Sequence, residues 1–372
     1  MKKLCHWRVQ MNIISYYPTF DELNSLRESH PKATSINVFL DLKNALGLLY
    51  VKNVAENLLE ITNNTDKPNS MIFLSWLDFV MFHYDYAIKN KIPIKIVTYA
   101  DVGEYQYHKA IYKEYKSNRS VTKKRTNSDL CESEDFHKIV LNNIETIMNA
   151  SKKFYNTKGV YLSFCESDFV PEYYISKYFT DDKYLNIIYS SDRDYVQTLR
   201  FHNTVQFMKK SNHTRDFIDY SNWTNIILDT ESKQHRYDEA FKDLKVDNYI
   251  FMKSIMGDIG DGIPGVGGIG PIKAASYINE IQNNTNFNSI EQVLKYAADH
   301  REDPSTIGTW SKAVEEKKDI VYRNYRLMSF KELIDNLSLP TIEKLIKKED
   351  THLTLKETID TITVLRDKLK PW

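Results

Sequence analysis

Acidic residues stand at the ends of four apolar segments of the sequence, where carboxylates could bind metal ions. The segments read SINVFLDL, IPIKIVTYA, GVYLSFC and YLNIIYS. Each is short and rich in β-branched or aromatic residues, as is typical of a buried strand. The acids in or directly after them are Asp41, Asp101, Glu166, Asp168, Asp192 and Asp194. Ligands bind at the carboxyl ends of strands in open parallel sheets, so we expect these side chains to converge on one edge.

Converging carboxylates repel each other, and a cation must lie among them. Oxygen ligands favour Mg²⁺ or Mn²⁺ over zinc, and a set this large suggests two ions about 4 Å apart. Such a pair activates water and stabilises the leaving oxygen of a phosphodiester. A single acid at a strand end is more often a turn or helix-capping residue. Four strands that end alike favour the metal site.

A glycine-rich segment, Gly257–Ala275, reads GDIGDGIPGVGGIGPIKAA. It contains GxGxxG, but a helical pattern precedes it and Pro264 interrupts it, so we reject a dinucleotide site. We expect two helices joined by a glycine hairpin whose backbone grips phosphate without reading sequence. The residues expected to contact nucleic acid here are Gly265, Gly267, Gly268, Gly270 and Lys273. Asp258 and Asp261 could complete the metal cluster, or could simply cap helices.

A basic segment, YQYHKAIYKEYKSNR, follows the second acidic strand. Lys109, Lys113 and Lys116 are spaced i, i+4, i+7, which predicts one stripe on a helix over residues 107–116. Tyrosines such as Tyr107 interleave with the lysines and could stack on unpaired bases. By itself the pattern is typical of a solvated helix face. Beside a metal cluster it favours a phosphate-binding helix, followed by a flexible polar loop over 117–135.

The order of elements predicts an α/β fold with a mainly parallel central sheet flanked by helices. The expected strands are Ser35–Leu42, Ile92–Ala100, Gly159–Cys165 and Tyr184–Ser190. Helices are expected over 71–90, after Asn69 or Ser70 as the cap, and over 136–154 and 168–179. Residues 1–33 read as an extension, residues 34–246 as the core, and residues 247–372 as a helical C-terminal subdomain without strands.

The composition is that of a globular chain, with a formal net charge of zero. A neutral total argues mildly against a nucleic-acid enzyme, although it can hide local charge. The chain has 3 cysteines and no CxxC pair, so we expect neither a zinc site nor a disulfide framework. An intracellular, reducing compartment fits best. We identify no signal peptide and no apolar run of about 18 residues, and therefore expect no membrane association.

Three segments resemble the 5′-nuclease superfamily, which includes flap endonucleases, the 5′ exonuclease domains of bacterial DNA polymerases and phage exonucleases. They read GDIGDGIPGVGGIGPIKAA, SSDRDYVQTL and YHKAIYKEYKSNR. The likeness spans roughly residues 34–280 and is closest to phage members, including the phage ribonuclease H that removes replication primers. It implies a PIN-like core, a helix-three-turn-helix, and Mg²⁺-dependent cleavage at 5′ flaps, nicks or RNA primers in DNA replication or repair.

The resemblance also implies roles for particular residues. The ligands of two Mg²⁺ ions, for which Mn²⁺ can substitute, would be Asp41, Asp101, Glu166, Asp168, Asp192, Asp194, Asp258 and Asp261. Lys109 matches the lysine that contacts the scissile phosphate, and Lys116 matches a second basic residue of that helix. Lys113 and Arg119 would add nucleic-acid contacts, and the loop after Arg119 corresponds to an arch that passes the 5′ strand. The hairpin corresponds to the family's duplex-binding element, which in some members also holds K⁺.

The sequence departs from the family pattern in places. Many prokaryotic members have two adjacent acids where this chain has Asp168 and Phe169, so one ligand of the second ion is missing. Gly260 and Gly262 stand where Ser and Asn are common. Two alternatives stay open, a non-catalytic structure-specific DNA-binding protein and a ribonuclease of related fold. The expected substrates are branched or nicked DNA, or RNA–DNA primer junctions. A single-strand-binding protein or a sliding clamp is a candidate partner, and the host cytoplasm is the expected location for a phage protein.

Overall fold

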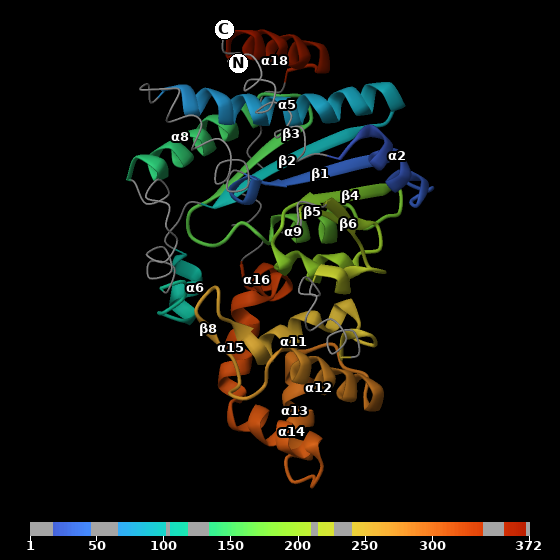
Figure 1. Cartoon of the computed structure of the whole chain (residues 1–372), viewed down its shortest axis with the longest axis vertical. Helices are drawn as coiled ribbons and strands as arrows, with labels where there is room; N and C mark the ends of the chain where they lie inside the picture. The colour runs from blue at the N-terminus through green and yellow to red at the C-terminus, as the bar shows by residue number, and fades with distance from the viewer. Residues whose placement is uncertain are drawn as a thin grey trace, which may run out of the picture.

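The computed structural model describes residues 18–45, 66–101, 105–117, 134–209, 215–226, 240–337 and 353–369 (Figure 1). Its centre is a 6-stranded sheet in the order β3-β2-β1-β4-β5-β6. The strands are β1 (Ser35–Asp41), β2 (Ile94–Asp101), β3 (Thr157–Leu162), β4 (Tyr184–Tyr189), β5 (Thr204–Lys209) and β6 (Arg215–Ile218). The first five are parallel, and β6 pairs antiparallel with β5 at the edge.

The four strands with acidic ends are neighbours in this sheet. The chain runs from β1 outward to β2 and β3, then crosses back to place β4 on the other side of β1. The reversal creates a topological switch point beside β1, the position at which open parallel sheets bind ligands. The predicted mainly parallel α/β architecture is therefore confirmed.

Helices cover both faces of the sheet, as the apolar character of its central strands requires. Val38 and Leu40 of β1 pack into the core under α5 (Asp66–Asn90) and α8 (Glu134–Ser151). Phe39, between them in sequence, points to the other face and packs in the core that contains α9 (Val170–Tyr178). This alternation follows from the two-residue period of a strand.

Helices from both ends of the chain reinforce the sheet half. Leu23 and Leu26 of α2 (Phe20–Glu28) are buried in the same core as α5. Ile362 of α18 (Leu355–Leu369) joins that core, and Figure 1 shows α18 lying along α5. Residues 20–28, which lie within the predicted extension 1–33, form a helix that packs in this core.

A second core lies below the sheet in Figure 1 and consists mainly of helices. They are α11 (Tyr249–Met256), α12 (Pro271–Asn284), α13 (Ile290–His300), α14 (Thr306–Glu316) and α15 (Lys318–Met328). Leu199 and Ile218, from the sheet half, also contribute to this core. The next helix, α16 (Phe330–Asn336), returns to the sheet half and packs against α9.

Several elements differ from the sequence predictions. We did not predict β5, β6, or the short strands β7 (Gly257–Asp258) and β8 (Ile263–Pro264), which lie beyond the point where strands were expected to stop. The long helix α5 begins at Asp66, before the predicted caps. Of the predicted polar loop, residues 118–133 lie outside the described residues, and α8 already begins at Glu134.

The described residues bear on two expectations from the sequence, one about membrane-spanning segments and one about the cysteines. None of their helices combines the length and apolar character that crossing a bilayer requires. Cys165 is buried and carries a free thiol, whereas Cys5 and Cys131 lie outside the described residues.

Candidate active site

The carboxyl ends of β1 and β2 place two buried acids side by side. Asp41 is the last residue of β1 and Asp101 the last of β2, and each residue is 5% exposed. Asp41 accepts hydrogen bonds from the Asn44 backbone amide at 3.0 Å and from the Ser190 hydroxyl at 2.9 Å. Asp101 accepts from the Tyr105 hydroxyl at 3.2 Å.

The turn after β4 brings two further acids to the same edge. Asp192 precedes the 3-10 helix η2 (Arg193–Arg200) and caps it, because its carboxylate accepts the Asp194 amide at 2.9 Å. Gln206 of β5 fixes this turn by donating to the carbonyl oxygens of Ser190 at 2.9 Å and Asp192 at 2.6 Å. The missed strand β5 therefore positions a predicted site residue.

Glu166 and Asp168 lie in the loop between β3 and α9. The Tyr195 hydroxyl approaches Asp168 at 3.4 Å. The next residue, Phe169, is 1% exposed and packs in the core against α9. The residue that follows Asp168 is therefore a core side chain and offers no ligand to a metal ion.

The β7–β8 hairpin contributes the last two acids. The Asp261 amide donates to the Asp258 carboxylate at 3.2 Å, which holds both residues in one turn. The Lys116 amide donates to the Asp261 carbonyl oxygen at 2.9 Å, and the Tyr115 hydroxyl approaches the Asp261 carboxylate at 3.4 Å. These bonds join the hairpin to the basic segment.

Three lysines lie among the acids and pair with five of them. Lys43 contacts Asp101 at 2.7 Å. Lys116 pairs with Glu166 and lies 3.6 Å from Asp261. Lys253, the third lysine, pairs with Asp194 and lies 3.0 Å from the Asp258 carboxylate.

The electrostatics show that the acids from different strands share one environment. Burial, together with the charges of Asp192 and Asp101, raises the pKa of Asp41 to about 7, although the hydrogen bonds from Asn44 and Ser190 oppose the shift. Burial also raises the pKa of Asp168 well above its ordinary value, with contributions from Asp41, Asp192 and Asp101. Burial raises the pKa of Asp194 to about 6, although Lys253 opposes the shift.

The hairpin acid behaves differently from the acids of the sheet. Burial alone would raise the pKa of Asp258, but Lys253 and two backbone amides outweigh burial and lower it. Lys253 is itself buried, which would lower its pKa. The carboxylates of Asp194 and Asp258 and the phenol of Tyr249 instead raise the Lys253 pKa well above its ordinary value.

The donor set fits divalent cations that prefer oxygen. Asp41, Asp168 and Asp194 all have raised pKa values because they are buried beside other acids, so a cation among them would relieve that repulsion. Among the described residues, no group of three or more His, Cys, Asp or Glu side chains is arranged to hold a metal ion.

The basic segment differs from the predicted stripe. Helix α6 (Gln106–Ile111) ends before the turn that contains Lys113 and Lys116, so the three lysines do not share one helical face. Tyr112 is extended at the C-cap, and Lys116 has a left-handed backbone with φ of 57°. Lys116 points into the acid cluster, whereas Lys109 and Lys113 are exposed. Arg119 lies outside the described residues.

The glycines of the hairpin segment fall into two groups. A Cβ on Gly265 would lie 2.1 Å from the Met256 carbonyl oxygen, so the packing of the chain itself requires a glycine there. At Gly267 and Gly270 a Cβ would meet nothing within 4 Å, and both backbones suit any residue. Gly268 has φ of +79° and accepts a hydrogen bond from the exposed Lys273 at 2.9 Å.

Sequence reasoning missed two residues of the cluster, Lys43 and Lys253. Lys253 is the single cation in the apolar helix YIFMKSIM and is 5% exposed. A lone lysine among buried positions is a signal that could have found it, because such a charge needs a partner. Lys43 follows Asp41 by two residues and offers no comparable signal.

The chain shares its fold with solved phage T5 structures, although no protein-family model and no curated protein matches its sequence. The T5 D15 protein co-crystallised with metal ions aligns with a TM-score of 0.54 at 16% identity. T5 5′-exonuclease with bound zinc aligns with 0.54 at 17%. A T5 D15 flap endonuclease variant, in a pseudo-enzyme–product complex with DNA and metal ions, aligns with 0.52 at 16%. Each alignment covers 89% of this chain and 99% of the other.

Proposed function

We propose that this chain is a structure-specific 5′-nuclease that hydrolyses phosphodiester bonds at 5′ flaps, nicks or RNA primers with two divalent metal ions. Mg²⁺ is the proposed ion, with Mn²⁺ as a substitute, and DNA replication or repair is the proposed setting. The proposal goes beyond the shared fold, because a fold can host many activities and the function must be argued from the site.

The observation that carries the proposal is the convergence of acids from two halves of the molecule. Four neighbouring strands supply six of the proposed ligands, and the β7–β8 hairpin supplies Asp258 and Asp261. The charges of Asp101 and Asp192 contribute to the raised pKa values of both Asp41 and Asp168, which supports one shared site. Acids that only capped turns would have no reason to repel each other at one sheet edge.

The proposed chemistry divides between the acids and the lysines. Divalent ions bound by the carboxylates would supply the Lewis acidity that activates water and stabilises the leaving oxygen. The acids would hold those ions at the switch point of the sheet. Lys116 and Lys253, which already lie between carboxylates, would stabilise negative charge on the phosphate, and Lys109 on α6 is proposed as a further contact.

The substrate would be held by its backbone. Gly267 and Gly270 lie in open space and have backbones that tolerate a side chain, so packing within this chain does not explain the glycines. Close approach of a phosphate backbone does explain them. K⁺ at this hairpin is proposed on the family resemblance alone. A T5 relative has been solved with DNA, which supports a DNA substrate here.

Cleavage of a duplex with a labelled 5′ flap tests the proposal. We expect release of the flap in Mg²⁺, no release with a chelator, and a loss on the order of a thousandfold or more in Asp192→Asn/Asp194→Asn. Release of single nucleotides would keep the mechanism and identify an exonuclease. If both this substrate and an RNA-primed duplex remained uncleaved in Mg²⁺, the proposal would be contradicted.

A non-catalytic DNA-binding protein is the second candidate, and the lysine pairing favours it. Lys43, Lys116 and Lys253 already compensate five carboxylates of the cluster. A DNA-binding protein whose acids are neutralised by lysines would gain no stability from divalent ions, whereas a metal-binding enzyme would. The change in melting temperature on adding Mg²⁺ to the chelator-treated protein therefore separates the two.

A further inference from the structure

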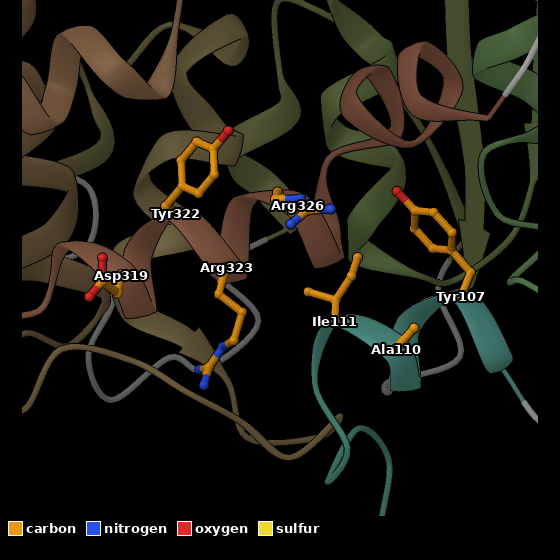
Figure 2. A pocket seen from close by; sticks show the side chains of 7 residues that line it. All are labelled: Tyr107, Ala110, Ile111, Asp319, Tyr322, Arg323 and Arg326. Atoms are coloured by element: carbon orange, nitrogen blue, oxygen red, sulfur yellow. The ribbon is translucent and has the colours of Figure 1, made fainter.

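A pocket of about 500 Å³ lies between α6 and α15, outside the acid cluster (Figure 2). Tyr107, Ala110 and Ile111 line it from α6. Figure 2 shows these side chains facing the helix that carries Tyr322, Arg323 and Arg326. Its size lies within the range of pockets that bind small ligands or cofactors.

The lining combines two guanidinium groups with aromatic and aliphatic surface. Within the described residues, no carboxylate forms a salt bridge with Arg323 or Arg326. Asp319 is the one acid of the lining and stands at the far end of the row in Figure 2. The pocket therefore has an excess of positive charge that suits one phosphate group, because guanidinium forks match phosphate geometry.

Contacts with neighbouring elements hold one of the two guanidinium groups in place. Arg323 stacks over the Tyr112 ring, 4.2 Å from its centroid, and donates to the Asn324 side-chain oxygen at 2.8 Å. The same guanidinium approaches the Pro264 carbonyl oxygen at 3.5 Å, in the β7–β8 hairpin. An arginine fixed in this way loses less conformational entropy when it binds an anion.

Arg326 lies beside the phenol of Tyr107. Burial raises the pKa of Tyr107, and the nearby Arg326 charge partly offsets that rise. The guanidinium and the aromatic ring are therefore presented together, which is the combination that contacts unpaired nucleotides through phosphate and base.

The pocket adjoins both elements to which the proposed function assigns the substrate. Consecutive helical residues are about 100° apart, so Lys109 projects from the side of α6 opposite to Tyr107 and Ile111. The pocket thus lies across α6 from the proposed phosphate contact. Through Arg323 it also touches the hairpin proposed to bind the duplex.

We propose that this pocket binds one unpaired nucleotide of the substrate's 5′ single strand, with its phosphate on Arg323 and Arg326 and its base against Tyr107 and Ile111. A base in a duplex could not enter the pocket, because the complementary strand would also have to fit between α6 and α15. The inference rests on the proposed function for the identity of the strand. It adds a subsite that senses whether an unpaired nucleotide is present.

Binding in a chelator tests the subsite without requiring cleavage. Fluorescence anisotropy would compare a duplex that carries a 5′ flap of about five nucleotides with the same duplex lacking the flap. We expect Arg323→Gln/Arg326→Gln to weaken binding of the flapped duplex on the order of tenfold and to lower its salt dependence, with little change for the flap-free duplex. The control, Lys177→Gln/Lys183→Gln, removes two positive charges that are exposed and lie outside the pocket, and it should bind both substrates as the wild type does.

Arg323 also contacts Tyr112 and the hairpin, so Arg326→Gln alone provides a second variant that leaves those contacts intact. It should show a smaller loss that is still specific to the flap, with an unchanged melting temperature. Equal losses on both substrates, or none on either, would overturn the subsite. A wild-type chain that shows this flap-specific binding but never cuts would contradict the nuclease proposal and leave the subsite standing.

Discussion

At the scale of single residues, the acid cluster is held together by buried lysines. Lys253 has a side chain that is 6% exposed and lies between Asp194 and Asp258. Lys116 bridges Glu166 and Asp261 in the same way. Each ammonium reduces the repulsion between acids that come from different parts of the chain.

Replacing Lys253 should destabilise the metal-free protein and be partly compensated by metal. Lys253→Gln leaves two partly buried carboxylates without their cation, which should cost about 3 kcal/mol of unfolding free energy in a chelator. Mg²⁺ should restore part of that loss by taking over the neutralising role. Urea unfolding with and without Mg²⁺ measures both effects. Lys32→Gln, which breaks an exposed pair with Asp182, is the control and should change little.

The raised pKa of Asp41 predicts a stability that falls with pH in the absence of metal. Its folded-state pKa is about 7, against an ordinary value of 3.8. Between those values the folded chain keeps a proton that the unfolded chain has released, so rising pH favours unfolding by up to about 1.4 kcal/mol per pH unit. Urea unfolding in a chelator from about pH 5 to about pH 7 should show a shallower decline for Asp41→Asn than for the wild type. Parallel curves would contradict this assignment.

At the scale of elements, the hairpin segment separates glycines needed for packing from glycines that leave room for a ligand. Gly267→Ala should keep stability within about 0.5 kcal/mol, because its Cβ meets nothing in the chain. It should still weaken binding to a flap-free duplex if phosphate approaches there. Gly265→Ala should destabilise the fold strongly, because its Cβ would lie 2.1 Å from the Met256 carbonyl oxygen. Melting temperature measures the effect of Gly265→Ala on the fold, and duplex affinity measures the effect of Gly267→Ala on binding. Unchanged duplex affinity in Gly267→Ala would count against duplex binding at this turn.

The sequence predicted the strands that carry acids because each is a continuous apolar run that ends in a charge. It did not predict β5 or β6, since TVQFMK and RDFI are short and mix polar with apolar residues. Those strands are fixed by pairing with β4 and with each other, which a local pattern does not record.

The basic segment shows how a tertiary contact can override helical spacing. Lysines at i, i+4 and i+7 predicted one stripe, yet the chain leaves the helix at Ile111. The Lys116 amide bonds to the Asp261 carbonyl oxygen at 2.9 Å, and this contact holds Lys116 in a left-handed conformation beside the acids. Periodicity could not foresee a contact between residues so far apart in sequence.

At the scale of the whole molecule, buried amides connect the acid cluster to the helical core. Gln197 donates to the carbonyl oxygens of Asp194 at 3.0 Å and Met328 at 3.1 Å, and it accepts the Phe330 amide at 2.8 Å. Asn324 donates to the Pro264 carbonyl oxygen of the hairpin at 2.9 Å. The junction between α15 and α16 therefore contacts the turn that carries Asp194.

Gln197→Met should consequently lower metal affinity as well as stability. It removes three hydrogen bonds while keeping the volume, so we expect a loss of about 2 kcal/mol and weaker Mn²⁺ binding. Gln282→Met is the control, because Gln282 bonds to Asn248 and to the Asp243 carbonyl oxygen, outside the acid cluster. Calorimetric Mn²⁺ titration and melting temperature should show reduced stability in both variants but reduced affinity only in Gln197→Met. Unchanged affinity in Gln197→Met would contradict the positioning role.

The zero net charge hides a strongly uneven local distribution. Acids at the ends of β1, β2 and β4, in the loop after β3 and in the β7–β8 hairpin lie near Lys43, Lys116 and Lys253, while Arg323 and Arg326 line a separate pocket between α6 and α15. A molecule arranged in this way can bind phosphate locally without being basic overall.

If these acids form one site for two divalent ions, electron paramagnetic resonance should count the bound Mn²⁺ ions. We expect about two ions per wild-type chain, and fewer than one in Asp192→Asn/Asp194→Asn, at unchanged secondary structure. A wild-type chain that binds no Mn²⁺, or a double variant that binds as many ions as the wild type, would contradict the two-ion site.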